Sequence, residues 1–331
     1  MSAEVSTALT IGVDIGGSKV AAGVVDAGGV VLAARRRPTP YLDARRTEDV
    51  IVELVGELAG SHEVCAIGVG AAGWVGVDGG TVLFSPHLAW RNKPLRAALQ
   101  HRIGRPVYVD NDANAAAWAE YRFGAGRGAA VLVCLTLGTG IGGGLVLGGA
   151  VFRGAFGLAG EWGHARVVPD GRPCPCGNRG CWEQYVSGRS LAAAARDLAA
   201  ADPAAAAAVL GLAGGDPAAL RGEDVTAAAA AGDPAAGVLL RTAGHWLGQG
   251  IADLAAALDP DVVVVGGGLS EVGEVLLGPA RQRYAEVLTG RGYRPEASIR
   301  LAELGPAAGL VGAADLARAA WTAAGPGLPA A

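Results

Sequence analysis

The sequence contains few aromatic residues, a single methionine and no large excess of charge of either sign. Aromatic residues account for 5% of the 331 residues, and 27 basic residues against 31 acidic ones give a net charge of -4. A slightly acidic chain is not expected to wrap a polyanion over a broad basic surface. We therefore expect a core built mainly from aliphatic residues and no nucleic acid among the partners.

A long apolar segment and a secretory leader are also missing. No uninterrupted apolar run approaches the roughly 18 residues that a membrane-spanning helix requires. The first residues, MSAEVSTALTIGVD, show neither the basic start nor the long apolar stretch of a signal peptide. We therefore expect a cytoplasmic protein without a membrane partner.

Glycine is the residue type in clear excess, with 54 positions, whereas roughly 7% is the average usage. Strand-like runs alternate with helical segments along the chain. Three β-rich runs occupy 8–37, and apolar periodicity predicts helices over 47–58, with Thr47 as the cap, and over 234–258. This alternation predicts an α/β protein, and the length suits two domains.

Three glycine-rich loops are candidates for binding phosphate groups through backbone N–H groups. For the first loop alone, an ordinary tight hairpin is the favoured interpretation. The second formally matches the dinucleotide fingerprint, but a strand-like run follows it where such a site requires a helix. The third ends a buried strand, where α/β folds bind ligands. Together they favour a nucleotide, with these candidate residues: Asp14, Gly16, Gly17, Ser18, Lys19, Gly138, Thr139, Gly140, Gly266, Gly267 and Gly268.

The segment DNDAN at 110–114 lies where a strand is expected to end and a helix to begin. A helix N-terminus stabilises negative charge, so a carboxylate there is a candidate general base. Capping of the helix by Asp110 or Asn111 is a simple alternative that does not exclude the first interpretation. Beside the first glycine loop, Asp14 could hold Mg²⁺ through water.

Three of the five cysteines, Cys174, Cys176 and Cys181, fall within eight residues, and His164 is the nearest further donor. This set can close a tetrahedral Zn²⁺ site, which we expect to be structural; free thiols or an iron–sulfur cluster are the alternatives. The remaining cysteines, at 65 and 134, lie in apolar runs and are expected in the core.

A metal at that position would hold two nearby carboxylates, Glu161 and Glu183, around one point together with His164. Carboxylate oxygens accept hydrogen bonds from sugar hydroxyls, so this group suits a polyhydroxylated ligand. The alternative is that both glutamates are solvated loop residues.

Taken in order, these motifs resemble those of the ROK family, most closely its actinobacterial glucokinases. The matching segments cover nearly the whole chain, and the His-Cys-x-Cys-x4-Cys block is highly specific to the family. They are DIGGSK at 14–19, NDAN at 111–114, LTLGTGIGGG at 135–144, GLAGEWGH to CPCGNRGCWE at 157–183 and VVVVGGG at 262–268.

The resemblance implies a two-domain, actin-like (ribonuclease H-like) ATPase fold with an interdomain cleft. The small α/β domain would comprise 1–114 and a C-terminal helix at about 307–325. The large α/β domain would comprise 115–306, with a zinc-binding loop at 164–181. The family also implies a homodimer or homotetramer.

The resemblance further implies phosphorylation of glucose at the 6-hydroxyl, with ATP and Mg²⁺ as donor. By position, Asp112 is the catalytic base. The three glycine loops would bind ATP. The implied hexose shell is Gly73, Asn111, Asp112, Glu161, His164 and Glu183, and the implied zinc ligands are His164, Cys174, Cys176 and Cys181.

One departure concerns fine specificity: many members have Pro-Gly where this chain has Ala72-Gly73. Kinases of N-acetylmannosamine, fructose or allose therefore stay open, and so does polyphosphate as donor. A sugar-responsive repressor of the family would carry a winged helix-turn-helix, for which the 13 residues before Asp14 are too few. A third alternative is an NAD-dependent dehydrogenase, which the strand expected after the second glycine loop disfavours.

Overall fold

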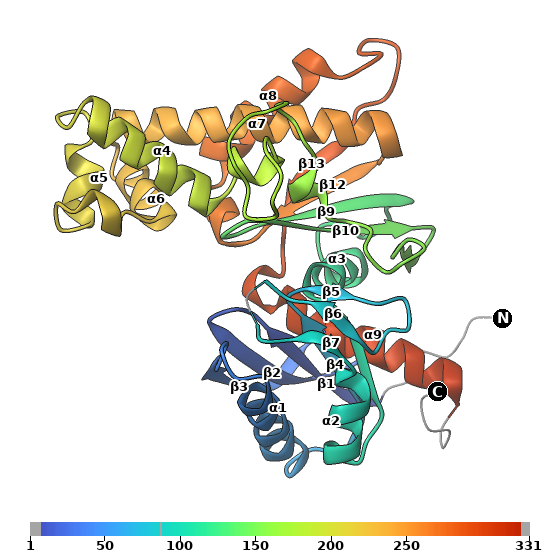
Figure 1. Ribbon diagram of the computed structural model, residues 1–331. Helices are drawn as coiled ribbons and strands as arrows, with labels where there is room; N and C mark the ends of the chain where they lie inside the picture. The colour runs from blue at the N-terminus through green and yellow to red at the C-terminus, as the bar shows by residue number, and fades with distance from the viewer. Residues whose placement is uncertain (1–7, 87, 326–331) are drawn as a thin grey trace. The chain divides into compact units, whose positions relative to one another are not determined.

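The computed structural model describes residues 8–86 and 88–325, which form a mixed α/β protein of two compact units (Figure 1). Unit 1 contains Met1–Gly128, Gly144–Gly160 and Glu303–Ala331, and unit 2 contains Ala129–Gly143 and Glu161–Ala302. Unit 1 therefore includes 115–128 and 144–160, which the sequence assigned to the large domain. Among the described residues, no helix has both the length and the apolar character needed to cross a membrane.

Unit 1 is built on a five-stranded sheet of order β3-β2-β1-β4-β8. The first three strands form antiparallel hairpins, as expected, whereas β1, β4 and β8 run parallel. A small antiparallel sheet of β5, β6 and β7 accompanies it. The strands are β1 (Leu9–Ile15), β2 (Lys19–Val25), β3 (Val31–Pro38), β4 (Val64–Ala71), β5 (Trp74–Val75), β6 (Val82–Phe84), β7 (Arg91–Lys93) and β8 (Val107–Asn111).

The described residues of unit 1 form four α-helices: α1 (Ala44–Ala59), α2 (Leu95–Ile103), α3 (Asp112–Phe123) and α9 (Ala308–Ala324), the last preceded by the 3-10 turn η5 (Gly305–Ala307). Side chains of β1 alternate between the two faces of the sheet. Ile11, Val13 and Ile15 join the apolar core with α1 and α2. The opposite face of β1 lies against α9.

Glycine allows α9 to approach the sheet at backbone distance. A Cβ atom at Gly12 would meet the carbonyl oxygen of Leu310, and one at Gly68 would meet that of Ala313. Gly12 and Gly68 are register partners on the parallel strands β1 and β4, so they form one flat surface for the helix. Because α3 packs on α9 in turn, residues 115–123 belong with unit 1.

Unit 2 contains the parallel strands β9 (Val131–Leu137), β12 (Val262–Gly266) and β13 (Ser298–Leu301). They belong to a sheet of order β11-β10-β9-β12-β13, which also contains the hairpin of β10 (Ile141–Leu147) and β11 (Ala150–Val151), whose residues from Gly144 onward are counted with unit 1. The expected strand after the second glycine loop is thus confirmed. The long helix α7 (Pro234–Leu258) and the helix α8 (Glu274–Val287) lie side by side (Figure 1).

The remaining elements of unit 2 are helices, of which α4 and α8 have 14 residues each and α7 has 25. They are η1 (Trp162–His164), η2 (Trp182–Gln184), α4 (Gly188–Ala201), α5 (Ala207–Leu212), η3 (Pro217–Ala219), α6 (Gly222–Ala230), α7 (Pro234–Leu258), η4 (Gly268–Val272) and α8 (Glu274–Val287).

The prediction that Thr47 caps the first helix is wrong. Helix α1 begins three residues earlier, and the carboxylate of Asp43 accepts a hydrogen bond from the backbone N–H of Arg46. Thr47 is buried, and its hydroxyl donates to the carbonyl oxygens of Pro40 and Asp43. The apolar period located the helix, but it could not distinguish the cap from a hydroxyl within the first turn.

Candidate active site

The parallel strands of unit 1 bring three acidic residues to one edge of the sheet. Asp14 precedes the end of β1, Asp110 lies near the end of β8, and Asp112 begins α3. Asp14 and Asp110 are both register partners of Gly70 on the intervening strand β4. A Cβ atom at Gly70 would lie 3.5 Å from the Cα atom of Asp112. Glycine in the middle strand therefore leaves room for the start of α3.

Asn111 is the N-cap of α3, as the simpler of the two sequence interpretations proposed. Its side-chain oxygen accepts hydrogen bonds from the backbone N–H groups of Ala113, at 2.9 Å, and Asn114, at 3.0 Å. Its amide nitrogen donates to Oδ1 of Asp112 at 3.0 Å. Capping and positioning of the carboxylate are therefore performed by the same side chain, so the two interpretations are compatible.

The amide of Asn111 also donates to the carbonyl oxygen of Gly73 at 3.0 Å. Gly73 has a φ of 148°, and a Cβ atom there would lie 2.5 Å from the carbonyl oxygen of Phe84. The hydroxyl of the buried Ser85 donates to the carbonyl oxygen of Ala72 at 2.6 Å. The Ala72-Gly73 loop is thus attached to the turn of Asp112 and cannot accept a larger residue at Gly73 without strain.

The first glycine loop is a tight hairpin between β1 and β2. The backbone N–H of Gly16 donates to the carbonyl oxygen of Lys19 at 3.0 Å. The hydroxyl of Thr39 donates to the carbonyl oxygen of Gly16 at 2.8 Å. Gly17, Ser18 and Lys19 are exposed at the tip. The interpretation favoured for this loop alone, an ordinary tight hairpin, is therefore correct for its backbone. The exposed hydroxyl and ammonium groups remain accessible to an anion.

The ionisation of Asp14, one of the acidic groups at this edge, is strongly perturbed. Burial, and to a smaller extent the negative charge of Asp112, raise its pKa from 3.8 to about 7, although the ammonium of Lys19 opposes both effects. Gly309 at the start of α9 makes room for it, since a Cβ atom there would lie 2.9 Å from the carboxyl carbon. Such a carboxylate is ready to accept a cation, because a cation offsets both the burial and the repulsion.

The Asp14→Asn variant should be more stable than the wild type at pH 7.5 in the absence of Mg²⁺ and nucleotide. The folded pKa of about 7 exceeds the ordinary value of 3.8, so the folded state retains a proton that the unfolded state releases. Stability of the wild type is therefore lost as pH rises from about 4 to about 7. The difference should reach a few kcal/mol, at about 1.4 kcal/mol per pKa unit, and should shrink towards pH 4.

Urea denaturation of both proteins at pH 4.5, 6 and 7.5 measures this difference. Asp197→Asn, on the exposed side of α4, is the matched control and should show no such pH dependence. An Asp14→Asn advantage that is absent, or equal at all three pH values, would contradict the assignment.

The second and third glycine loops lie next to each other in unit 2. Gly138 begins the turn from β9 to β10, where its N–H donates to the carbonyl oxygen of Gly140 at 3.0 Å. Gly267 follows β12 with a φ of 85°, and a Cβ atom there would meet the backbone of Leu137. The structure therefore brings together two loops that are over 120 residues apart in sequence.

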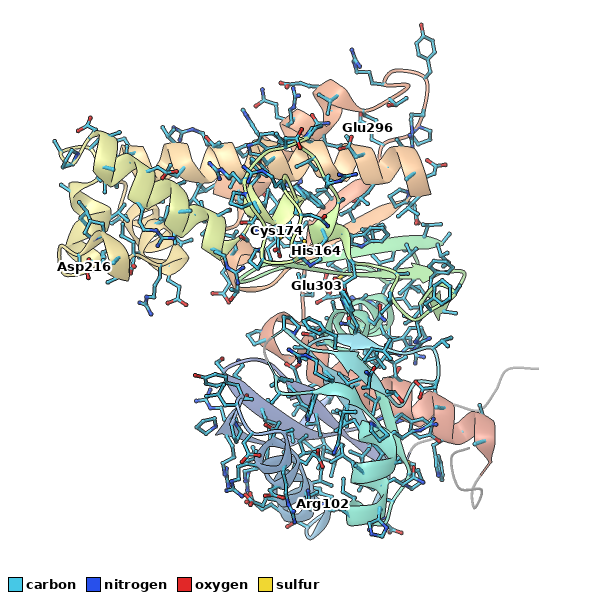
Figure 2. The ribbon with its side chains drawn as sticks, viewed as in Figure 1. Arg102, His164, Cys174, Asp216, Glu296 and Glu303 are labelled. Carbon is cyan, nitrogen blue, oxygen red and sulfur yellow. The ribbon has the colours of Figure 1, made fainter. Side chains whose placement is uncertain are left out.

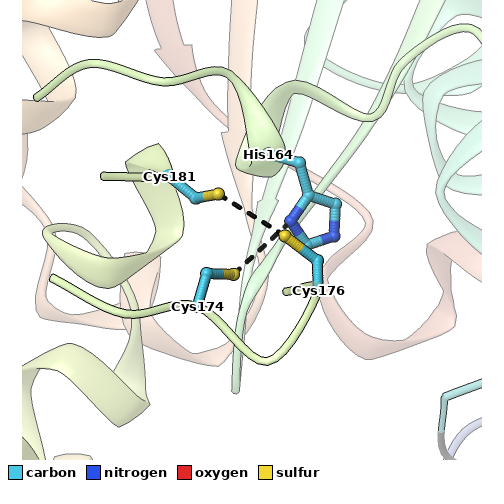
Figure 3. Close-up of side chains that lie close together, drawn as sticks. All are labelled: His164, Cys174, Cys176 and Cys181. Carbon is cyan, nitrogen blue, oxygen red and sulfur yellow. Dashed lines mark hydrogen bonds between the residues drawn. The ribbon is translucent and has the colours of Figure 1, made fainter. Parts of the chain in front are cut away.

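The four residues expected to bind a metal form one cluster in unit 2 (Figure 3). One donor atom each from His164, Cys174, Cys176 and Cys181 lies within 4.8 Å of the others. The Sγ atoms of Cys176 and Cys181 are 3.6 Å apart, and Sγ of Cys174 lies 3.8 Å from Nδ1 of His164. Burial raises the pKa of Cys174 far above its usual range. A cation would reverse that effect, so this donor set fits a metal better than three free thiols.

The carboxylate of Glu183 lies against this cluster. Its Oε1 is 3.2 Å from Sγ of Cys174 and 3.9 Å from Nδ1 of His164, and the side chain is 12% exposed. Glu161 lies on the other side of the imidazole, with Oε2 at 4.0 Å from Nε2. Figure 2 labels His164 and Cys174 side by side in this unit. The imidazole thus presents one nitrogen to the thiols and the other to a carboxylate.

The expected residues are therefore placed in two groups, one in each unit. Unit 1 holds Asp14, the hairpin 16–19, Gly73, Asn111 and Asp112, and unit 2 holds the other two glycine loops, both glutamates and the metal ligands. Cys134 is buried on β9 and Cys65 is half-buried on β4, apart from the cluster.

Sequence reasoning missed one member of the second group, Gln184. Its amide nitrogen donates to Oε1 of Glu183 at 3.1 Å and to Sγ of Cys174 at 3.5 Å. The available signal in the sequence was its side-chain amide, directly after Glu183, which was already expected to lie beside the metal ligands.

Comparison with known proteins places these groups in a family context. The sequence profile of the ROK family matches residues 10–320. The glucokinase of Streptomyces coelicolor is 48% identical over 310 residues, which cover 94% of this chain and 98% of that protein. The N-acetylmannosamine kinase of Escherichia coli O157:H7 is 36% identical over 268 residues, covering 79% of this chain and 84% of the other.

Among solved structures, a ROK family glucokinase from Streptomyces griseus in complex with glucose and AMPPNP is similar throughout. Its TM-score is 0.87 at 50% identity, and the match covers 94% of this chain and 99% of that one. This similarity confirms the two-domain, actin-like ATPase fold expected from the sequence.

Proposed function

Because the chain belongs to the ROK family, we propose that it is an ATP-dependent glucokinase that phosphorylates glucose at the 6-hydroxyl. The observation that carries the proposal is the similarity, over nearly the full length, to glucokinases, one of which has been solved with glucose and an ATP analogue. Acidic residues at the carboxyl edge of parallel strands beside glycine hairpins are consistent with this chemistry.

Asp112 is the proposed general base. Its Oδ1 accepts hydrogen bonds from the backbone N–H of Ala113 at 2.9 Å and from the Asn111 amide, which fix the orientation of the carboxylate. The carboxylate accepts the proton of the 6-hydroxyl as that oxygen attacks the γ-phosphorus of ATP. The bond from that phosphorus to the bridging oxygen breaks, and ADP leaves with its electron pair. Phosphoryl transfer depends mainly on such positioning and on charge neutralisation.

The phosphate groups of ATP are assigned to the hairpin 16–19 and the loop 138–140, and the adenosine side to 266–268. Exposed Ser18 and Lys19 supply a hydroxyl and an ammonium, and glycine exposes backbone N–H groups in each loop. Asp14 is the proposed partner of Mg²⁺ through water, since a cation there would offset the burial and the repulsion from Asp112 that raise its pKa. When bound, Mg²⁺ neutralises charge on the β- and γ-phosphates.

The proposed hexose shell combines Gly73, Asn111 and Asp112 with Glu161, His164 and Glu183. Carboxylate oxygens accept from sugar hydroxyls, whereas the asparagine amide and the imidazole N–H can donate. Nδ1 of His164 faces the thiols, so this nitrogen is the proposed zinc donor and Nε2 is left for the sugar side. Each polar residue would thus recognise a hydroxyl group.

The metal of the cysteine cluster is proposed to be a structural Zn²⁺. Three thiolates and one imidazole would complete a tetrahedral coordination sphere around such an ion, and no position would then be left for substrate. Its contribution is to hold the loop that carries Glu161 and Glu183 in a defined conformation.

Gly140→Ala should raise the KM for glucose about tenfold. A Cβ atom at this position would overlap Oε2 of Glu183, whose flexible end must move away. A carboxylate turned from its place loses a hydrogen bond to sugar, a change of order 1.4 kcal/mol or more. Gly138→Ala is the control, because its Cβ would meet no atom within 4 Å. Steady-state kinetics that show equal glucose KM values for both variants would contradict the role of Glu183.

Three further properties belong to the same proposal. Reduced thiols in a metal cluster suit a cytoplasmic location, and the net charge of -4 argues against nucleic acid as a partner. A homodimer or homotetramer is proposed from the family resemblance, and a role in glycolysis would follow from the product.

A coupled assay over a panel of hexoses and donors tests the function. We expect glucose with Mg²⁺·ATP to give the highest kcat/KM. A preference for N-acetylmannosamine would instead indicate the activity named for the N-acetylmannosamine kinase relative. Turnover with polyphosphate alone would show that polyphosphate, and not ATP, is the phosphoryl donor. Absence of phosphorylation with every hexose would overturn the proposal.

A further inference from the structure

We propose that Arg153 is a positioning residue for phosphoryl transfer, which acts through Asp110 on the turn that carries Asp112. The inference rests on the kinase function proposed above. It concerns residues of unit 1 alone, since Arg153 belongs to the segment Gly144–Gly160.

The carboxylate of Asp110 is the centre of the network. It is 8% exposed, and each of its oxygens accepts two hydrogen bonds. Oδ1 accepts from the backbone N–H of Asn111 at 2.8 Å and from the side-chain amide of Asn114 at 3.0 Å. Oδ2 accepts from Nε and Nη2 of Arg153, at 2.9 and 2.5 Å. The carboxylate is therefore saturated, and the guanidinium supplies both its counter-charge and half of its hydrogen bonds.

Both residues that donate hydrogen bonds to Oδ1 of Asp110 flank Asp112 in sequence. Asn111 precedes it, caps α3 and donates to its Oδ1, while Asn114 lies within the first turn of the helix. Rotation of the Asp110 carboxylate would release the N–H of Asn111 and the amide of Asn114 together. The orientation of the proposed base depends on Asn111, whose amide donates to its Oδ1, so a displacement at Asp110 is transmitted through Asn111 to the reacting carboxylate.

Arg153 is fixed by its own backbone surroundings. It follows β11, its Nη1 donates to the carbonyl oxygen of Val151 at 3.3 Å, and its carbonyl oxygen accepts from Ala159 at 3.1 Å. Gly154, with a φ of 73°, turns the chain immediately after it. The guanidinium thus reaches Asp110 from a defined position more than forty residues away in sequence.

Loss of Arg153 would leave a nearly buried carboxylate without its cation. Leaving this charge buried and unpaired costs more free energy than the intact ion pair contributes. The carboxylate is therefore expected to rotate towards water. A displacement of about 1 Å at a reacting group is enough to cost on the order of 10²-fold in rate. Nothing in this chain of contacts involves the nucleotide loops. The effect should therefore appear in kcat, with the KM for ATP unchanged.

The experiment compares full-length Arg153→Met, Arg153→Lys, Asp110→Asn and the double variant Arg153→Met/Asp110→Asn. We expect Arg153→Met to lower kcat at least tenfold, with unchanged zinc content and KM for ATP. Arg153→Lys should recover part of the loss, because it keeps the charge but not both hydrogen bonds. Arg46→Met is the matched control: Arg46 pairs with Glu53 at 2.8 Å on α1, and its loss should leave kcat within twofold.

The double variant separates positioning from other roles. A neutral amide at 110 can still accept from Asn111 and Asn114 and needs no cation, so Arg153→Met should cost less than twofold in that background. Additive losses would overturn the inference, and so would a raised KM for ATP at unchanged kcat, which would indicate direct contact with phosphate.

A lower melting temperature with wild-type kcat would show a structural role only and would likewise overturn it. If Arg153→Met does not fold, the test rests on the kcat of Arg153→Lys. A kcat below that of the wild type would support the inference, and a wild-type kcat would overturn it. An inactive wild type would instead overturn the proposed kinase function, and the inference with it.

Discussion

Asp112→Asn should lower kcat by about 10²- to 10⁴-fold, the range expected when a general base is removed. Asparagine keeps an oxygen in the place of Oδ1, so the hydrogen bonds from Ala113 and from the Asn111 amide can both remain. The cap of α3 is provided by Asn111 and is unaffected. The variant should therefore differ from the wild type in proton acceptance and in little else.

Binding and stability measurements make this test specific. Calorimetric titration should give a glucose Kd within a few-fold of the wild-type value, zinc content should be unchanged, and the melting temperature should shift by only a few degrees. Rapid-quench measurement of a single turnover should show that the chemical step is slowed. Near-wild-type turnover would remove Asp112 from the role of base.

Cys176→Ser should release the metal and raise the glucose KM by an order of magnitude or more. Serine is not a thiolate donor, and three remaining ligands bind Zn²⁺ far more weakly than four. Cys176 is exposed, so the substitution itself creates no cavity in the core. The expected loss follows from disorder of the loop that carries Glu183, whose Oε1 lies 3.2 Å from Sγ of Cys174.

Metal analysis of the purified variants provides the measurement. Cys65→Ser is the control, because Cys65 is half-buried on β4 and lies outside the cluster, so it should retain one zinc per chain. Wild-type protein that contains no zinc, or a Cys176→Ser variant with full metal content and an unchanged KM, would contradict the proposed cluster.

Much of the fold could be predicted because the relevant signals are local. The apolar repeat over 234–258 matches α7 at both ends, since Asp233 caps the helix and Pro234 occupies its first turn. The run at 262–265 is a fully buried strand between two parallel neighbours. The cysteine spacing likewise limits how far apart the ligands can lie.

What could not be predicted depends on contacts between distant segments. The start of α1 is set by Asp43 rather than Thr47, a choice between two polar residues one turn apart. Assignment of 144–160 to unit 1 depends on packing of β11 against α3. The Arg153–Asp110 pair has no sequence signature at all, because neither residue belongs to a recognisable motif with the other.

The contact between α9 and the first strands has a consequence for biosynthesis. Nη2 of the buried Arg318 donates to the hydroxyl of Thr10 at 2.8 Å, across 308 residues of sequence. Gly12 and Gly68 face the backbone of the same helix. At roughly 5–20 residues per second, on the order of ten seconds or more separates emergence of β4 from that of α9. During that interval the face of the incomplete sheet that α9 later covers stays exposed and open to aggregation.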